Sequence, residues 1–132
     1  MLDFRNIRIN NRMPVYIQIA HYVKQQVLLG KAVPGDELPS RREIAAQLNI
    51  NPNTAQKAYK LMEDEGYVVT NGNLGSEIYV DDKIYAKIKE ELTHEMTRQF
   101  IQSAKEVNLS FKDVIELLSR YWDETGDGRQ DG

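Results

Sequence analysis

Two helical patterns joined by a three-residue turn constrain the fold of this chain more than any other feature. Ser40 precedes the run RREIAAQLN, and a glutamate three residues after Ser40 completes the pattern of a capping box at a helix start. After the turn Asn-Ile-Asn, Asn51 can cap a second helix and Pro52 suits its first position, where a backbone N–H has no partner. This second run continues to Gly66, a residue typical of helix ends. The segment therefore predicts a helix-turn-helix over residues 41–60.

The flanking segments add one helix before this motif and a β-hairpin after it. The run PVYIQIAHYVKQQVLLG places apolar residues at the helical period between Pro14 and Gly30. After the motif, the β-rich runs YVVT and EIYV surround NGNLGS, and an Asn-Gly pair between such runs is typical of a hairpin. The order helix, helix, tight turn, helix, hairpin is the winged helix-turn-helix arrangement. We expect this domain over residues 10–80, with the wing at 67–80.

Residues 81–123 show a different pattern, that of two amphipathic helices separated by VNLS. Their combined apolar surface exceeds what a small winged domain can cover, so it predicts a partner surface, and a second copy of the chain is the simplest partner. The predicted dimerisation residues are Ile84, Ile88, Leu92, Met96, Phe100, Phe111, Val114, Leu118 and Trp122. We expect residues 124–132 to be a disordered tail. The predicted fold class is thus mostly α with a small β-hairpin.

Composition places the chain among soluble proteins with an ordinary core. It has 132 residues, of which 41 % are hydrophobic and 28 % charged, and no cysteine. No apolar run approaches the roughly 20 residues that span a membrane, and the N-terminus lacks a signal-like apolar region. Absence of cysteine excludes disulfides and thiolate chemistry. We therefore expect a cytoplasmic protein without a membrane partner.

The net charge of −3 does not argue against DNA, because the acidic excess lies in one part of the chain. Residues 1–80 carry nine Lys/Arg and eight Asp/Glu, whereas residues 81–132 carry eight and twelve. A slightly basic first part can bind DNA if its cations are gathered on one face. The charge distribution is therefore compatible with double-stranded DNA as the partner.

The residues of the predicted third helix point to the same partner. Its outward side chains are of the types that pair with base edges in the major groove. They are Asn53, Thr54, Gln56, Lys57 and Lys60. At the start of the helix before it stand Ser40, Arg41 and Arg42, where a helix N-terminus and two cations suit a phosphate group. The two groups would form one DNA-binding surface.

These motifs together resemble a known family. The run PVYIQI, followed by LPSRREIAAQLNINPNTAQKAYKLMEDEGYV, is similar to the winged-helix domain of the GntR family of bacterial transcription regulators, over about residues 10–80. The NPNT turn and the short C-terminal part resemble the YtrA subfamily in particular. The resemblance implies a dimeric repressor, commonly of a transporter operon, in which a short helical tail mediates dimerisation and no large effector domain is present.

The resemblance also assigns individual residues. Arg42 matches the family arginine that opens the second helix and contacts DNA. Contacts at the start of the recognition helix fall at Asn51, Asn53, Thr54 and Gln56, the last standing where many relatives have an arginine. Relatives usually end the wing with Gly-x-Gly-Thr-Phe-Val and carry a basic residue at its tip, whereas the wing here has no Lys or Arg. Wing contacts through Asn71, Gly72 and Asn73 are therefore expected to be weaker than usual.

Other interpretations of the same residues remain open at this point. Asn51 and Pro52 can be a helix start and nothing more, and the cations can be a solvated face. A winged helix can also bind a protein instead of DNA, which the wing without cations favours and the polar third helix opposes. An enzyme is not expected, because no nucleophile with a base, paired carboxylates or metal cluster is recognisable. His21 and His94 lie on separate helices, so neither a metal site nor a cofactor is expected.

The sequence says little about regulation. No segment is long enough for a separate ligand domain. A small-molecule effector of unknown identity could bind between the C-terminal helices or at their junction with the winged domain, in a cavity lined by aromatic residues. The same aromatics could instead form the core of the dimer. The residues concerned are Tyr85, Phe100, Tyr121 and Trp122.

Overall fold

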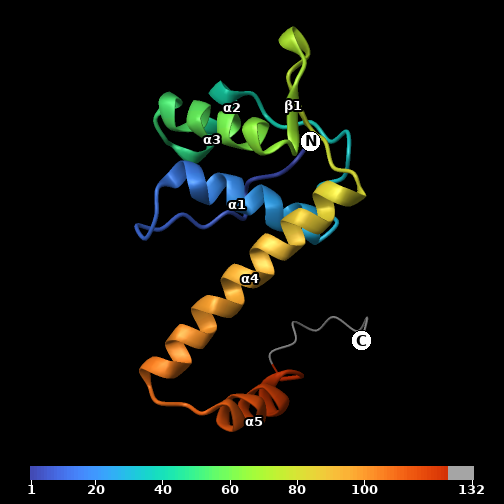
Figure 1. Cartoon of the computed structure of the whole chain (residues 1–132). Coiled ribbons are helices and arrows are strands. Elements are labelled where there is room, and N and C mark those ends of the chain that lie inside the picture. The colour runs from blue at the N-terminus through green and yellow to red at the C-terminus, as the bar shows by residue number, and fades with distance from the viewer. Residues whose placement is uncertain (125–132) are drawn as a thin grey trace. The chain divides into compact units, whose positions relative to one another are not determined.

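A computed structural model describes residues 1–124 of the chain, which divides into two compact units, Met1–Glu90 and Glu91–Gly132. Three helices and a hairpin make up most of the first unit (Figure 1). A long helix, α4 (Asp82–Glu106), begins in the first unit and continues in the second. The fold class is the predicted one, mostly α with a two-stranded hairpin. Of the expected disordered tail, residues 125–132 lie outside the described residues.

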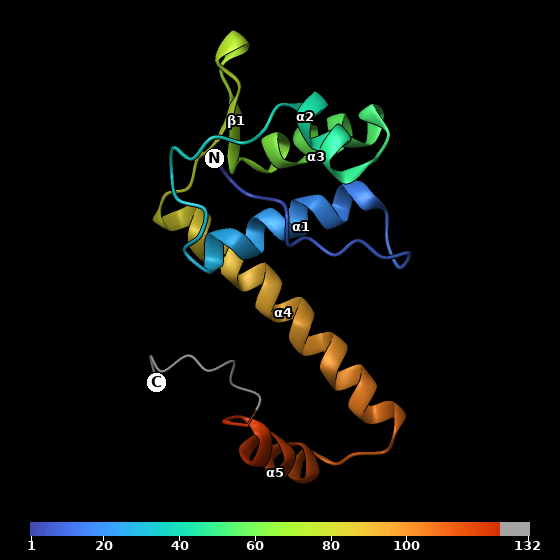
Figure 2. The ribbon, with the colours of Figure 1, turned by 180° about the vertical axis from the view of Figure 1, so that it is seen from behind.

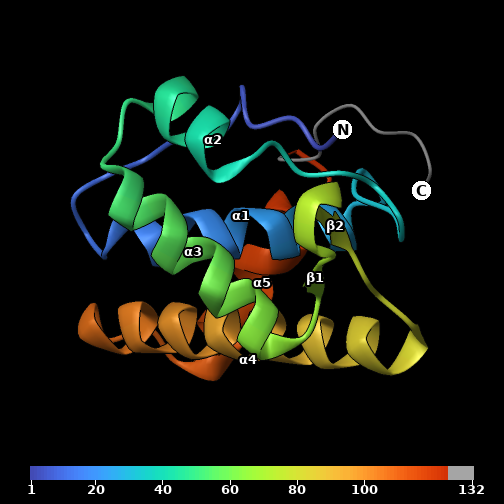
Figure 3. The ribbon, with the colours of Figure 1, turned by 90° about the horizontal axis from the view of Figure 1, so that it is seen from above.

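The first unit is built on α1 (Val15–Leu28), α2 (Arg41–Leu48) and α3 (Pro52–Glu65). Both α1 and α2 pack against α3. Figures 1 and 2 show α1 and α3 next to each other, and Figure 3, seen from above, shows that α3 crosses α1 at an angle. The side chains that meet between these helices are fully buried, among them Ile19, Val23, Ile44, Tyr59 and Met62. This core holds α3 at a fixed place on the surface of the unit.

The start and end of α3 follow from its terminal residues. The Asn51 side chain accepts a hydrogen bond from the N–H of Asn53 at 2.7 Å, and Pro52 takes the first helical position. At the other end Gly66 adopts φ 92°, a left-handed conformation that favours glycine. The predicted bounds of this helix are confirmed.

The wing is an antiparallel hairpin of β1 (Val68–Thr70) and β2 (Ser76–Ile78), in which Val68 pairs with Ile78. Its tip is a 3-10 turn, Gly72–Leu74, so the connection is longer than the two-residue turn that Asn-Gly usually makes. A bridge between Glu37 and Glu77 pairs the loop before α2 with the other edge of β2. Strand β2 is therefore paired on both of its edges.

The N-terminal residues belong to the core of the first unit. Leu2 and Phe4 are buried, and the Phe4 ring lies 5.4 Å from the Tyr22 ring. The Tyr22 hydroxyl donates to the Asp3 carbonyl at 2.9 Å, and the N–H of Leu2 donates to the carbonyl of Glu37 at 2.7 Å. The structural unit Met1–Glu90 thus includes the first residues of the chain.

The second unit contains the C-terminal part of α4 and a shorter helix, α5 (Phe111–Tyr121). The chain turns between them at Asn108, which has φ 62°. Ser110 and Asp113 form a capping box, with Ser110 N donating to Asp113 Oδ2 at 3.0 Å and Asp113 N to Ser110 Oγ at 3.1 Å. No residue of α5 is buried within the described chain.

Candidate nucleic-acid interface

The turn between α2 and α3 fixes how the two helices present their polar residues. Asn49 ends α2 in a left-handed conformation, φ 56°, and the N–H of Ile50 returns to the carbonyl of Ala45 at 2.9 Å. At the start of α2 the Ser40 hydroxyl accepts from the N–H of Glu43 at 3.0 Å, and the N–H of Ser40 donates to Glu43 Oε1 at 2.7 Å. Ser40 and Asn51, both predicted as DNA contacts, are therefore helix caps in the first place.

The outer face of α3 is polar and carries side chains without internal partners. Ala55, Ala58, Tyr59 and Met62 form its buried face. On the opposite face Asn53, Gln56, Lys57 and Lys60 are exposed and Thr54 is half-buried. Within residues 1–124, the side chains of Asn53, Thr54 and Gln56 make no hydrogen bond to the protein. Their donors and acceptors are free for an external partner of matching polarity, such as base edges.

The two lysines of α3 differ in what they contact. The ammonium of Lys57 lies 5.7 Å from the centre of the Tyr16 ring on α1, within cation–π range. Lys60 pairs with Asp64, one turn later, at 3.6 Å, and both side chains are well exposed. An exposed pair of this kind contributes at most about 1 kcal/mol, so Lys60 can leave it for a phosphate.

The adjacent arginines at the start of α2 have opposite surroundings. The guanidinium of Arg41 donates to Glu63 Oε2 at 2.9 Å and lies 4.9 Å from the centre of the Tyr59 ring. Arg42 is exposed and has no ion pair or hydrogen bond among the described residues. Arg42 is therefore available for a phosphate or a base, while Arg41 is held inside the unit.

Arg41 belongs to a polar cluster that reaches the base of the wing. Glu63 also accepts a hydrogen bond from the hydroxyl of Thr70, and that hydroxyl lies 2.6 Å from the Ser76 hydroxyl. The cluster thus joins the start of α2, the end of α3 and both strands of the hairpin. Sequence reasoning missed this arrangement, because nothing local in the chain pairs position 41 with position 63.

The buried Tyr59 hydroxyl supports the same region. It donates to the carbonyl of Pro39, the residue before the α2 cap. Burial raises the pKa of Tyr59 well above its usual range, so the hydroxyl keeps its proton at all ordinary pH values. This hydrogen bond ties α3 to the loop that leads into α2.

The tip of the wing carries the three residues that the resemblance assigned to DNA. Asn71, Gly72 and Asn73 are all exposed there. The Asn71 amide donates to Glu77 Oε1 at 3.0 Å, so it is partly occupied within the wing. Leu74, which the sequence did not single out, is 84 % exposed beside them. The tip is neutral and partly apolar, in line with the absence of Lys and Arg from residues 67–80.

Most of the predicted dimerisation residues are accessible in the single chain. Met96 is 63 % and Phe111 80 % exposed, Phe100, Leu118 and Trp122 are also exposed, and Ile84, Leu92 and Val114 are half-buried. Ile88 differs, because it is only 2 % exposed within one chain. Ile88 is therefore part of the monomer's own packing and does not belong to the accessible apolar stripe.

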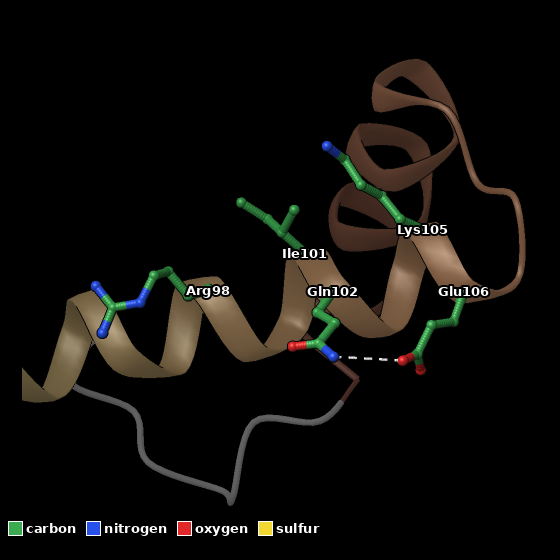
Figure 4. Close-up of a pocket in the computed structure, with 5 residues that line it drawn as sticks. All are labelled: Arg98, Ile101, Gln102, Lys105 and Glu106. Atoms are coloured by element: carbon green, nitrogen blue, oxygen red, sulfur yellow. Dashed lines mark hydrogen bonds between the residues drawn. The ribbon is translucent and has the colours of Figure 1, made fainter.

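The second unit also has an open hollow on the surface of α4, with a cavity volume of about 530 Å³ (Figure 4). It is lined by Arg98, Ile101, Gln102, Lys105 and Glu106. Gln102 Nε2 donates to Glu106 Oε2 at 3.4 Å. All five residues come from one helix and are exposed, and none is among the four aromatics considered for an effector. The hollow is too open to enclose a ligand.

Two further features of the described residues bear on the class of protein. Among residues 1–124, no group of three or more His, Asp or Glu side chains is placed to hold a metal ion. In the same range, no helix combines the length and the apolar character needed to cross a membrane. What the fold and the site define is a winged helix-turn-helix with a polar, partly cationic recognition helix, the class of DNA-binding regulators.

Comparison with known proteins gives the family. Residues 15–78 match the family model described as bacterial regulatory proteins, gntR family. The HTH-type transcriptional regulator YhcF of Bacillus subtilis is 37 % identical over 108 residues, 82 % of this chain and 89 % of that protein. The HTH-type transcriptional repressor YtrA of the same organism is 35 % identical over 106 residues, 80 % and 82 % of the two chains.

A solved structure agrees with these relatives. A GntR family transcriptional regulator from Listeria monocytogenes superposes with a TM-score of 0.76 at 26 % identity, covering 85 % of this chain and 98 % of that one. The chain belongs to the GntR family. It is a DNA-binding transcriptional regulator and not an enzyme.

Proposed function

We propose that the protein is a homodimeric repressor that reads an inverted-repeat operator through α3. The observation that carries this proposal is the outer face of α3, where Asn53, Thr54 and Gln56 have no partner within residues 1–124. Each good base contact from such side chains contributes about 1–3 kcal/mol of discrimination. Because its partner is chromosomal DNA, the protein acts in the cytoplasm.

The proposed DNA contacts divide into two kinds. Arg42, Lys57 and Lys60 approach phosphates and supply affinity that falls with salt. Asn53, Thr54 and Gln56 face the bases and supply discrimination. Ser40 and Asn51 act mainly as caps that orient the two helix starts, and the wing adds weak contacts through Asn71, Gly72 and Asn73. Arg41 contributes through its contact with Glu63 rather than through DNA.

Dimerisation is proposed from the exposed apolar residues of the second unit. A stripe that includes Met96, Phe100, Phe111 and Leu118 would not stay in water without a partner. A second copy of the chain gives two recognition helices, and their entry into successive major grooves about 34 Å apart defines an inverted repeat. YtrA, a relative over most of both chains, is named a repressor, and occlusion of a promoter by such a dimer is the simplest mechanism.

Selection of bound duplexes from a randomised pool tests this proposal. We expect the recovered sequences to align as an inverted repeat with half-sites one helical turn apart. Gln56→Ala should relax the preference at one position in each half-site by about 1–3 kcal/mol and leave the others unchanged. Lys60→Ala is the matched control, because it should weaken all duplexes alike.

The outcomes separate this function from the protein-interaction alternative. Recovery of no common sequence, at low and at moderate salt, would contradict base reading and favour a winged helix that binds a protein. A single half-site bound by a monomer would keep base reading and overturn the dimeric part of the proposal.

A further inference from the structure

The N-terminal third of the chain has an unusual charge distribution. Residues 4–35 contain five Lys/Arg and no Asp or Glu. Two of the five are paired in the structure: Arg5 with Asp3 at 2.7 Å and Lys24 with Glu65 at 2.7 Å. Arg8 and Arg12 have no ion pair among the described residues, and both are exposed. Two free guanidinium groups therefore lie on residues 8–13, the N-terminal loop, which precedes α1.

This N-terminal loop is held in place by a buried side chain. Gln18 on α1 accepts from the N–H of Asn10 at 3.0 Å and donates to the carbonyls of Asn10 at 2.9 Å and of Met13 at 2.6 Å. The Asn10 side chain in turn accepts from the N–H of Arg12 at 2.8 Å. Four hydrogen bonds thus fix the backbone around Arg12. This backbone therefore loses little conformational entropy when the loop binds a partner.

The N-terminal loop lies at the end of the unit where α3 begins. Figures 1 and 3 show from two directions that the segment before α1 lies at the same end of the unit as the first turns of α1 and α3, and in Figure 1 α1 lies between this segment and α3. The contact of Lys57 on α3 with the Tyr16 ring on α1 agrees with this placement. Because the start of a recognition helix points into the major groove, the loop accompanies the part of α3 nearest the DNA.

The width of the DNA major groove allows the N-terminal loop to contact the phosphates at its edge. Packed helices lie about 8–10 Å apart, and the major groove is about 12 Å wide. A segment at the end of the unit where α3 begins can therefore reach one of the two phosphate strands that border the groove. Arg8 and Arg12 belong to the segment at this end of the unit, and both side chains are exposed without an ion pair among the described residues.

We propose that the N-terminal loop is an additional DNA-binding element in which Arg8 and Arg12 bind phosphates beside the half-site read by α3. This inference rests on the proposed function, since it places the loop relative to α3 in the groove. Arginine suits the role because its planar guanidinium binds a phosphate through two hydrogen bonds. The wing has no Lys or Arg with which to bind a phosphate, so the loop would supply affinity that the wing does not.

Salt dependence of binding tests the inference with the full-length protein and the duplex recovered by selection. In the double variant Arg8→Gln/Arg12→Gln, loss of two phosphate contacts should make the slope of log Kobs against log[salt] less negative by about 1.8. Affinity at about 0.1 M salt should fall on the order of 50-fold. The fall should be similar for the selected duplex and for a scrambled one, because phosphates carry no sequence.

The matched control is the double variant Arg5→Gln/Lys31→Gln. It also removes two positive charges, one from Arg5, which precedes the loop and is paired with Asp3, and one from Lys31, which follows the far end of α1. Its salt slope should equal that of the unmodified protein. The charge-conserving variant Arg8→Lys/Arg12→Lys should restore most of the slope, and circular dichroism checks that all variants fold.

Equal slopes for the two Gln double variants would overturn the inference. If the unmodified protein still selects a common sequence in that case, the proposed function stands and only the loop contact is rejected. If the unmodified protein selects no sequence, the proposed function fails, and the inference fails with it.

Discussion

The two units of the chain treat their apolar side chains in opposite ways. In Met1–Glu90 the large apolar residues of α1 and α3 are buried against each other, and even Leu2 and Phe4 join that core. In Glu91–Gly132 the described apolar residues of α4 and α5 are largely exposed, as Met96 and Phe111 illustrate. The first unit buries its large apolar side chains within one chain. In the second unit, one chain leaves most of the described large apolar side chains exposed.

The two units also differ in how far their polar side chains are bound within the chain. In the first unit Gln18, Arg41 and Tyr59 are bound internally, and the free polar groups gather on α3, Arg42 and the N-terminal loop. In the second unit, α5 is fixed at its start by a capping box and by no buried residue. This difference supports the proposed division of roles, in which the first unit recognises DNA and the second unit mediates assembly.

A Met→Ala substitution in each unit should give the largest difference in the free energy of unfolding. Met62→Ala removes a fully buried side chain from the core of the first unit and should lower the free energy of unfolding by about 2–5 kcal/mol. Met96→Ala removes an exposed side chain and should change the stability of the monomer by at most about 0.5 kcal/mol. Urea unfolding at several protein concentrations measures both, and equal losses for the two variants at the lowest concentration would contradict the comparison.

The second contrast concerns assembly. Phe111→Asp/Leu118→Asp places two charges on the exposed apolar face of α5 and should convert the dimer to a monomer. Affinity for a full operator should then fall at least about 100-fold, because two linked half-sites no longer bind together. Sedimentation velocity and operator titration measure the two effects. Ser119→Asp, on the polar face of the same helix, is the control and should leave both unchanged.

Much of the first unit could be predicted because local signals determine it. Asn51, Pro52 and Gly66 define α3 to the residue, and Ser40 with Glu43 defines the start of α2. The winged-helix order follows from the sequence of these elements. The family resemblance then assigned Arg42 and the first turn of α3, and both lie on the accessible face of the unit.

The unpredicted features depend on contacts between distant residues. Helical periodicity does not indicate that Leu2 and Phe4 complete the core, that Gln18 holds the loop before α1, or that Arg41 binds Glu63. At Ile88 the helical periodicity predicted a dimer contact, but the structure already buries this side chain within one chain. A sequence pattern gives the face of a helix and leaves open what covers that face.

The neighbouring arginines offer a smaller and sharper test within the first unit. Arg42→Gln should make the salt slope of operator binding less negative by about 0.9, corresponding to one lost phosphate contact. Arg41→Gln should leave the slope unchanged and instead lower the free energy of unfolding by about 1–2 kcal/mol, because Glu63 loses a charged partner. Salt titrations of DNA binding and urea unfolding of both variants measure this. A slope change for Arg41→Gln equal to that for Arg42→Gln would return Arg41 to the DNA surface.

The smallest expected effect is the response of the second unit to acid. Hydrogen bonds from the backbone and side chain of Ser110 lower the pKa of Asp113 below its usual value of 3.8. A carboxyl whose pKa is lower in the folded chain stabilises the fold above its unfolded pKa, and this contribution is lost as the pH falls through the folded pKa. Within the described chain, α5 has this capping box and no buried residue.

Dimerisation should therefore be constant between about pH 7 and pH 5 and should begin to weaken below about pH 4. Asp113→Asn keeps the size of the side chain but cannot titrate, so its dimer should be weaker at pH 7 and should depend less on pH. Sedimentation across this range measures the effect. An unchanged pH profile in Asp113→Asn would show that other carboxylates control the acid response and that α5 is held by packing against its partner rather than by its cap.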